Sequence, residues 1–207
     1  MKIFVNMLSL FRICVAFAIV PTLMFQWYWL SVILFICGAI SDWLDGYLAR
    51  KFNVCTKLGG VLDHIGDKLL IVNTLVMLAL MMTPNQLYLR FFWYIIVPVI
   101  IMIDRELYIS GLREFLGTQK IEMPVPKSRL SMGKIKAALQ MLTVIAFLLL
   151  FAISTMLNPD TISAKILMTM NILSQTGLIL LWFALVASLW SATQYTFTFL
   201  GKLKKIK

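Results

Sequence analysis

Four aspartates lie within a short stretch of a chain that has only nine acidic residues. Asp42 and Asp45 are three residues apart and Asp63 and Asp67 are four apart, so each pair would lie on one face of a helix. Neighbouring carboxylates repel one another unless a cation lies between them, and oxygen ligands suit Mg²⁺, Mn²⁺ or Ca²⁺. The pattern therefore predicts a divalent-metal site, and a set of four carboxylates could hold two such ions.

Glycines and an arginine surround these carboxylates. Gly46, Gly59 and Gly60 lie within a few residues of the aspartates, although glycine in a helix costs about 1 kcal/mol relative to alanine. Their presence indicates that a bulky group approaches the backbone closely. Arg50 can donate a bidentate pair of hydrogen bonds to a phosphate. We therefore expect the metal site to bind a substrate that carries phosphate.

The elements that must position these residues are long apolar segments. Hydrophobic residues make up 61% of the 207 residues, against about 45–50% in soluble domains. A membrane span needs roughly 20 apolar residues, and six such segments cover residues 7–24, 29–48, 58–82, 91–115, 130–157 and 167–200. The sequence predicts an all-α integral membrane protein, a bundle of six transmembrane helices that forms one domain over residues 1–207.

The basic residues predict the orientation of this bundle, because they are enriched on the cytoplasmic side of a membrane. They cluster at the amino end (Lys2 and Arg12), after the second segment, around the fourth connection and at the carboxyl end, whereas the other connections offer only Arg90 and Lys165. Six crossings with both termini in the cytoplasm place every cluster on that side. The net charge of +10 then reflects orientation and attraction to anionic lipid rather than nucleic acid.

The aspartates lie at the end of the second apolar segment and the start of the third, so the site is expected to face the cytoplasm. The alternative is that they are solvated surface charges beside Arg50, Lys51 and Lys57. We disfavour it because charged residues in membrane spans are costly and usually functional.

The aspartates and their neighbours form one longer pattern, Asp42-x2-Asp45-Gly46-x2-Ala49-Arg50-x8-Gly59-x3-Asp63-x3-Asp67. It resembles, at every fixed position, the signature of the CDP-alcohol phosphotransferase family. The resemblance implies a homodimer and two ions, Mg²⁺ or Mn²⁺, held by Asp42, Asp45, Asp63 and Asp67. It also implies that Asp67 is the catalytic general base on the acceptor hydroxyl. The cytidine diphosphate of the donor would be held by Gly46, Ala49, Arg50 and Gly59.

Downstream basic residues bear on the acceptor. Arg105 and Arg113 are eight residues apart on one segment, and Lys134 begins the next. An acceptor that carries its own phosphate would need such groups. These segments resemble the phosphatidylglycerophosphate synthase branch of the family, in which the acceptor is glycerol 3-phosphate. On that resemblance, the phosphate of glycerol 3-phosphate is bound by Thr56, Arg105, Arg113 and Lys134.

The resemblance implies an enzyme of the bacterial inner membrane. It would transfer the phosphatidyl group from CDP-diacylglycerol to glycerol 3-phosphate, giving phosphatidylglycerophosphate and CMP. Other acceptors stay open, namely inositol phosphate, serine or a second lipid, as does a divalent-cation transporter. Arg105 and Arg113 could instead pair locally with neighbouring acidic residues. His64, beside a proposed ligand, is expected to face away, because adjacent residues on a helix point about 100° apart.

Overall fold

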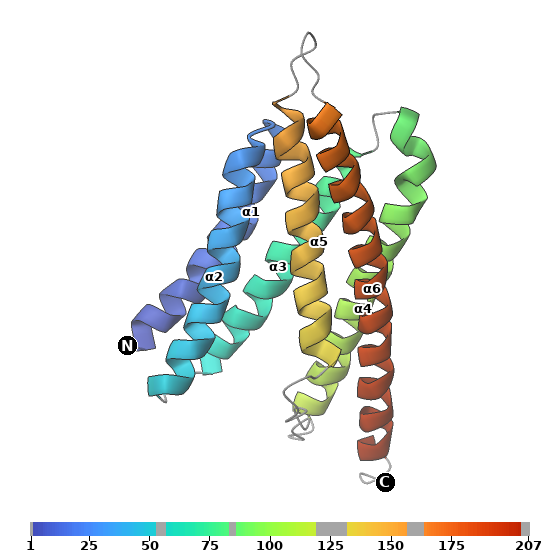
Figure 1. The fold of residues 1–207 in the computed structure, drawn as a ribbon. Coiled ribbons are helices and arrows are strands. Elements are labelled where there is room, and N and C mark those ends of the chain that lie inside the picture. Colours follow the sequence, from blue (N-terminus) through green and yellow to red (C-terminus); the bar gives the residue numbers. More distant parts are fainter. Residues whose placement is uncertain (1, 53–56, 83–85, 119–131, 157–163, 204–207) are drawn as a thin grey trace.

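The computed structural model describes residues 2–52, 57–82, 86–118, 132–156 and 164–203. The described residues form helices joined by turns, with no strand among them, which confirms the predicted all-α class. Six helices follow one another along the chain (Figure 1): α1 (Lys2–Met24), α2 (Tyr28–Phe52), α3 (Lys57–Met81), α4 (Gln86–Thr118), α5 (Met132–Ser154) and α6 (Ala164–Leu203).

Five of these helices, α1, α2, α3, α5 and α6, are long and apolar enough to cross a membrane. The chain is therefore a membrane protein. We expected a sixth span over residues 91–115, and α4 covers that range as a helix of 33 residues. Three consecutive charged residues, Asp104, Arg105 and Glu106, interrupt its apolar sequence. A sixth crossing thus stays a prediction.

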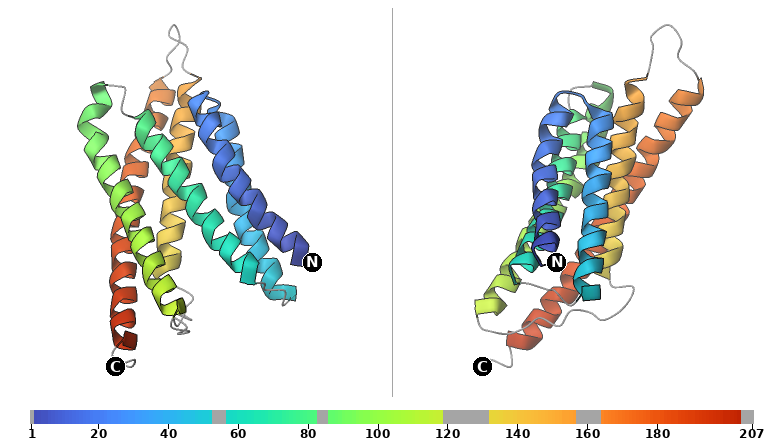
Figure 2. Two further views of the ribbon diagram at one scale, coloured as in Figure 1. Left: turned by 180° about the vertical axis from the view of Figure 1, so that it is seen from behind. Right: turned by 90° about the vertical axis from the view of Figure 1, so that its left-hand side faces the viewer.

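The helices pack as two groups of three. α1 contacts α2 and α3, α6 contacts α4 and α5, and α2 and α3 connect the groups through contacts with α5 and α4. The groups lie close together at the upper end of Figure 1 and diverge toward the lower end, where both termini lie (Figures 1 and 2). The divergence opens the lower end of the bundle between the two groups.

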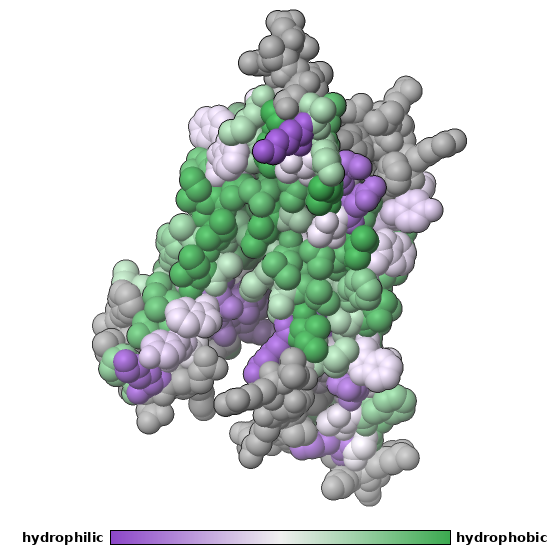
Figure 3. Space-filling view, viewed as in Figure 1, coloured by the Kyte–Doolittle hydropathy of each residue, from purple (hydrophilic) through white to green (hydrophobic). Residues whose placement is uncertain are grey.

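Close packing holds each group together. Gly177 of α6 lies so near α5 that a Cβ there would meet the Phe147 ring at 2.9 Å. Gly38 of α2 likewise lies against Leu70 of α3. Many large apolar side chains face outward instead (Figure 3), as expected for helices that contact lipid rather than water.

The last helix is longer than one membrane crossing. At 1.5 Å per residue, the 40 residues of α6 span roughly 60 Å, whereas the hydrocarbon core is about 30 Å thick. Its carboxyl-terminal half runs beside the charged part of α4, and Arg105 donates hydrogen bonds to Ser188 and Ser191. α6 therefore helps to position the polar residues at the open end of the bundle.

Candidate active site

Three of the four predicted ligands converge in the structure. Asp42, near the end of α2, meets Asp63 and Asp67, which lie one turn apart near the start of α3. Each contributes a carboxylate oxygen, and these oxygens all lie within 4.8 Å of one another. Asp42 of the first aspartate pair therefore faces both members of the second pair.

Asp45 lies deeper than the other three, with 3% of its surface exposed. Its Oδ2 accepts hydrogen bonds from Ser9 Oγ at 3.2 Å and from Arg12 Nη2 at 2.5 Å. Asp45 therefore borders the group of three through α1 rather than belonging to it.

Arg12 connects the two parts. Its Nη1 lies 2.7 Å from Asp67 Oδ1, 2.9 Å from Asp42 Oδ1 and 3.0 Å from Asp63 Oδ1. Arg12 is fully buried, so it has a role in the site beyond that of a basic residue that orients the chain. The missed signal was an arginine inside an apolar run, one helical turn after Ser9.

The chemistry of these side chains fits a divalent cation. All the converging atoms are carboxylate oxygens, the ligands that Mg²⁺ and Mn²⁺ prefer. A guanidinium Nη carries two hydrogens, yet three carboxylates lie within hydrogen-bond reach of the same nitrogen of Arg12. The carboxylates thus converge on a position that a cation with more coordination sites would satisfy better.

A cavity of about 970 Å³ lies between the two helix groups, beside the aspartates. Asp42 and Asp67 line one side of it. Figure 3 shows hydrophilic side chains gathered in the hollow between the diverging groups. The other walls carry the basic side chains His64, Lys68, Arg105, Arg113, Lys134 and Lys136. One cavity therefore offers both a set of carboxylates and a basic surface.

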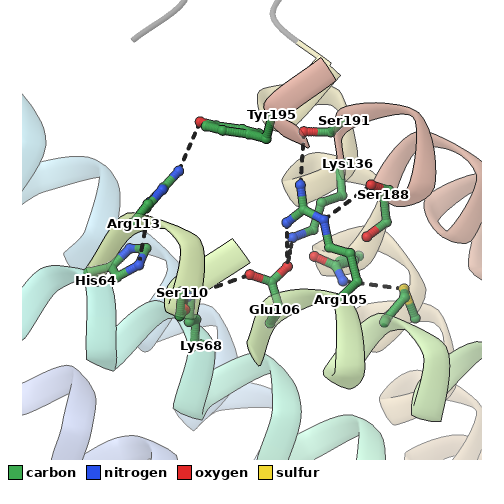
Figure 4. Close-up of polar contacts among 12 residues, drawn as sticks. His64, Lys68, Arg105, Glu106, Ser110, Arg113, Lys136, Ser188, Ser191 and Tyr195 are labelled. Carbon is green, nitrogen blue, oxygen red and sulfur yellow. Dashed lines mark hydrogen bonds and ion pairs between the residues drawn. The ribbon is translucent and has the colours of Figure 1, made fainter. Parts of the chain in front are cut away.

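The centre of the basic surface is organised by Glu106 (Figure 4). Its carboxylate accepts hydrogen bonds from Lys136 and from Arg105 Nη1, the latter at 3.0 Å, and it lies 3.7 Å from Lys68 Nζ. Lys68 also donates to Ser110. Lys68 was missed in the sequence, although a lysine next to Asp67 inside an apolar run is the kind of residue that is usually functional.

Arg105 has a second set of contacts, all to α6. Its Nε donates to the Ser188 carbonyl oxygen at 3.1 Å, and its Nη2 donates to Ser191 Oγ at 2.9 Å. Local pairing with Glu106, one of the alternatives for Arg105, is present as well. The guanidinium thus joins α4 to α6 at the back of the cavity.

Arg113 lies nearer the cavity mouth and is exposed. Its Nη2 donates to the Tyr195 hydroxyl at 2.8 Å, its guanidinium lies 5.0 Å from the centre of the Tyr195 ring, and its Nη1 lies 3.4 Å from His64 Nε2 (Figure 4). The His64 ring therefore contacts Arg113, and His64 lines the same cavity as Asp42 and Asp67. Lys134, also exposed, is part of the same cavity wall.

Of the four residues that were predicted to hold the donor, the structure describes only two in full. Gly46 and Gly59 are described on α2 and α3, whereas Ala49 and Arg50 belong to the last turns of α2 without a described side chain. Thr56, which was predicted to bind the acceptor phosphate, lies outside the described residues. A Cβ at Gly60 would meet nothing within 4 Å. There is thus open space on this side of the aspartates.

The sequence of this chain matches a known protein family. A sequence profile described as CDP-alcohol phosphatidyltransferase matches residues 2–190. The chain belongs to this family. The matched range includes the four aspartates, Arg12 and all six basic residues of the cavity wall, and it ends just before Ser191 and Tyr195.

Relatives in the family carry two different names. A Blochmanniella floridana protein named CDP-diacylglycerol–glycerol-3-phosphate 3-phosphatidyltransferase is 30% identical over 92% of this chain and 87% of its own. A Sodalis glossinidius (strain morsitans) protein of the same name is 31% identical over 92% and 91%. A rice protein (Oryza sativa subsp. japonica) named cardiolipin synthase (CMP-forming) is 37% identical over 52% of this chain and 33% of its own.

Proposed function

We propose that this protein transfers the phosphatidyl group of CDP-diacylglycerol to glycerol 3-phosphate, producing phosphatidylglycerophosphate and CMP. Family membership and the names of the relatives that cover most of the chain support this reaction. The single structural observation that carries the proposal is the shared cavity, in which Asp42 and Asp67 face a basic surface.

The aspartates serve the donor in this proposal. Asp42, Asp63 and Asp67 would hold one or two divalent ions, Mg²⁺ or Mn²⁺, with Asp45 contributing from its buried position. When bound, the ions would neutralise the donor diphosphate and the charge that develops on the leaving CMP. The cytidine diphosphate would lie along Gly46, Ala49, Arg50 and Gly59.

Asp67 is the proposed general base. It belongs to the converging carboxylates and also lines the cavity that would receive the acceptor. Its carboxylate oxygen would accept the proton of the free primary hydroxyl of glycerol 3-phosphate as that oxygen attacks the phosphorus of the phosphatidyl group. The bond from this phosphorus to the CMP oxygen breaks, and CMP leaves with the electron pair.

The basic surface serves the acceptor. Arg113 and Lys134 are exposed in the cavity wall and could donate to a phosphate that enters from solution. Lys68 lines the same cavity and could neutralise the same phosphate. Arg105 is hydrogen-bonded to α6 and Glu106, and its positive charge would attract the acceptor phosphate without a direct contact. Thr56 stays a proposed contact.

The site is proposed to face the cytoplasm of a bacterial inner membrane, with six crossings and both termini on that side. The two termini lie at the same end of the bundle, which favours an even number of crossings (Figure 1). We also propose a homodimer, on the family resemblance alone. Glycerol 3-phosphate would then enter the cavity from the cytoplasm while the donor tails stay in lipid.

The closest alternative is a lipid acceptor, as in a cardiolipin synthase. The basic surface favours a small acceptor with its own phosphate, but a phospholipid headgroup also carries one. A divalent-cation transporter is a weaker alternative, because the family is one of transferases.

One assay separates these functions. The purified protein is supplied with CDP-diacylglycerol and Mn²⁺, and CMP release is measured with glycerol 3-phosphate, inositol phosphate, serine or phosphatidylglycerol as the acceptor. We expect CMP with glycerol 3-phosphate alone. Release with phosphatidylglycerol alone would assign the lipid acceptor, and no CMP with any acceptor would contradict the enzyme and favour the transporter.

A further inference from the structure

Arg12 is the most completely buried charged residue described in the structure, and it lies within the candidate span Asn6–Met24. A charged side chain inside a membrane span is costly unless it is paired. Its Nε is buried without an acceptor among the described residues, whereas both Nη atoms contact aspartates. Among the described residues, the aspartates are therefore the hydrogen-bond acceptors of this guanidinium.

The two ends of the guanidinium have different surroundings. Nη2 contacts Asp45, which is buried and also accepts from Ser9. Nη1 contacts three aspartates whose side chains are 29%, 47% and 39% exposed, in the order Asp42, Asp63 and Asp67. One end is thus closed off, and the other lies where carboxylates are accessible to ions from solution.

The approach of α1 to α3 makes this placement possible. A Cβ at Gly66 would lie 3.4 Å from Arg12 Cδ and 3.6 Å from the Ser9 carbonyl oxygen, so α1 leaves room there for little more than a methyl group. One positive charge is thereby held against four carboxylates. The excess negative charge leaves a divalent ion strongly attracted to the same place.

We propose that Arg12 is a positioning residue that acts as the resident counter-cation of the aspartate site. Without metal, its guanidinium holds all four carboxylates together. When a divalent ion binds, Nη1 yields Asp42, Asp63 and Asp67 to the ion while Nη2 keeps Asp45 in place. This inference rests on the metal site of the proposed function and adds a residue that prepares it.

A linkage between Arg12 and metal follows. A ligand that binds only the folded state raises its stability. In the wild-type protein the arginine already offsets part of the repulsion among the carboxylates. Metal binding therefore adds only a limited amount of stability to the folded state. In Arg12→Met the metal-free protein has no cation at the site, and the divalent ion must offset all of that repulsion.

The test compares unfolding with and without metal. The wild-type protein and Arg12→Met are purified in detergent and treated with EDTA, and Tm is measured by tryptophan fluorescence before and after saturation with Mn²⁺. We expect the Mn²⁺-induced rise in Tm to be at least about twice as large in Arg12→Met as in the wild type. Arg12→Lys, which keeps the charge but cannot reach both sides at once, should give an intermediate rise.

Ile19→Ala is the matched control, since Ile19 is a fully buried apolar residue of the same helix. It should lower Tm equally with and without Mn²⁺. If Arg12→Met behaves like this control, the arginine has only a packing role and the inference is wrong. Should Arg12→Met fail to fold, Arg12→Lys carries the same comparison, and a wild-type-sized rise in that variant would contradict the inference.

Binding of Mn²⁺, measured by electron paramagnetic resonance, distinguishes this failure from failure of the proposed function. A wild-type protein that binds no Mn²⁺ would overturn the metal site, and with it the proposal that Arg12 gives up three aspartates to the ion. A wild-type protein that binds Mn²⁺, together with equal Tm rises in the wild type and Arg12→Met, would overturn the role of Arg12 alone.

Discussion

Asp67 and Arg113 are the two residues on which the proposed chemistry can be tested most directly. Asp67 belongs both to the converging carboxylates and to the cavity wall, so it can act on the donor side and on the acceptor. Arg113 lies exposed in the same cavity, held by Tyr195 and close to His64. Each residue predicts a different kinetic change.

Replacing Asp67 by asparagine keeps the shape of the side chain but removes its ability to accept the proton. We expect CMP release to fall by about 10²- to 10⁴-fold, the usual contribution of a general base. Loss of a proposed metal ligand would add to this. The measurement is CMP release with saturating glycerol 3-phosphate, alongside a Tm that shows the variant is folded.

Asp104→Asn is the matched control, because Asp104 is an exposed aspartate on α4 and is not part of the cavity wall. It should retain wild-type turnover. Near-normal turnover in Asp67→Asn would remove Asp67 from the role of base.

Arg113→Met removes the charge near the cavity mouth. A hydrogen bond to a charged group contributes about 1.5–3 kcal/mol, so KM for glycerol 3-phosphate should rise by about 10- to 100-fold while KM for CDP-diacylglycerol changes little. Steady-state kinetics with each substrate varied in turn measure both constants. Lys165→Met, which removes an exposed charge near the start of α6, should change neither. A rise in the donor KM instead would place Arg113 on the donor side.

At the scale of the elements, the contact between α5 and α6 depends on the absence of a side chain at Gly177. A Cβ there would meet three atoms of the Phe147 ring at 2.9, 3.1 and 3.2 Å. Phe147 is almost fully buried, so its ring has little freedom to move aside. The pairing of these helices matters to the site, because α5 carries Lys136 and α6 carries Ser191.

Gly177→Val should therefore destabilise the bundle. Overpacking a well-packed core costs about 1–3 kcal/mol, which lowers Tm by several degrees in a chain of this size. Gly111→Val is the control, because Gly111 is also helical and a Cβ there would meet nothing within 4 Å. The two variants share the same change in helix propensity. A similar Tm for both would therefore show that close packing at Gly177 does not contribute to the stability of the bundle.

At the scale of the whole molecule, the two helix groups diverge at the end where both termini lie, and the polar cavity lies between them (Figures 1 and 3). The five helices that are long and apolar enough to cross a membrane, together with the long α4, allow the six crossings that we proposed. If so, the termini and the cavity mouth lie on one side of the membrane.

Cysteine labelling tests this arrangement. In a background without Cys14, Cys37 and Cys55, we expect Lys2→Cys and Lys205→Cys to react with a membrane-impermeant maleimide only in inside-out vesicles. Asp160→Cys, in a connection expected outside, should react only in right-side-out vesicles. Labelling of Lys2→Cys and Lys205→Cys from opposite sides would mean an odd number of crossings.

Local sequence determined much of the molecule. Apolar run length predicted the helices, because a span requires a fixed number of residues, and helical spacing predicted that Asp63 and Asp67 share a face. The expectation that His64 faces away from the metal ligands follows from the same geometry, and in the structure its ring contacts Arg113. These features depend on residues a few positions apart.

Only the tertiary structure decided which distant residues meet. Arg12 lies more than 50 positions before Asp63 and Asp67, and its place among the aspartates depends on how closely α1 approaches α3. The attachment of Arg105 to α6 likewise joins residues more than 80 positions apart. Helical periodicity fixes neighbours on one helix, whereas the partners of a buried charge are fixed by packing between helices, which no local pattern encodes.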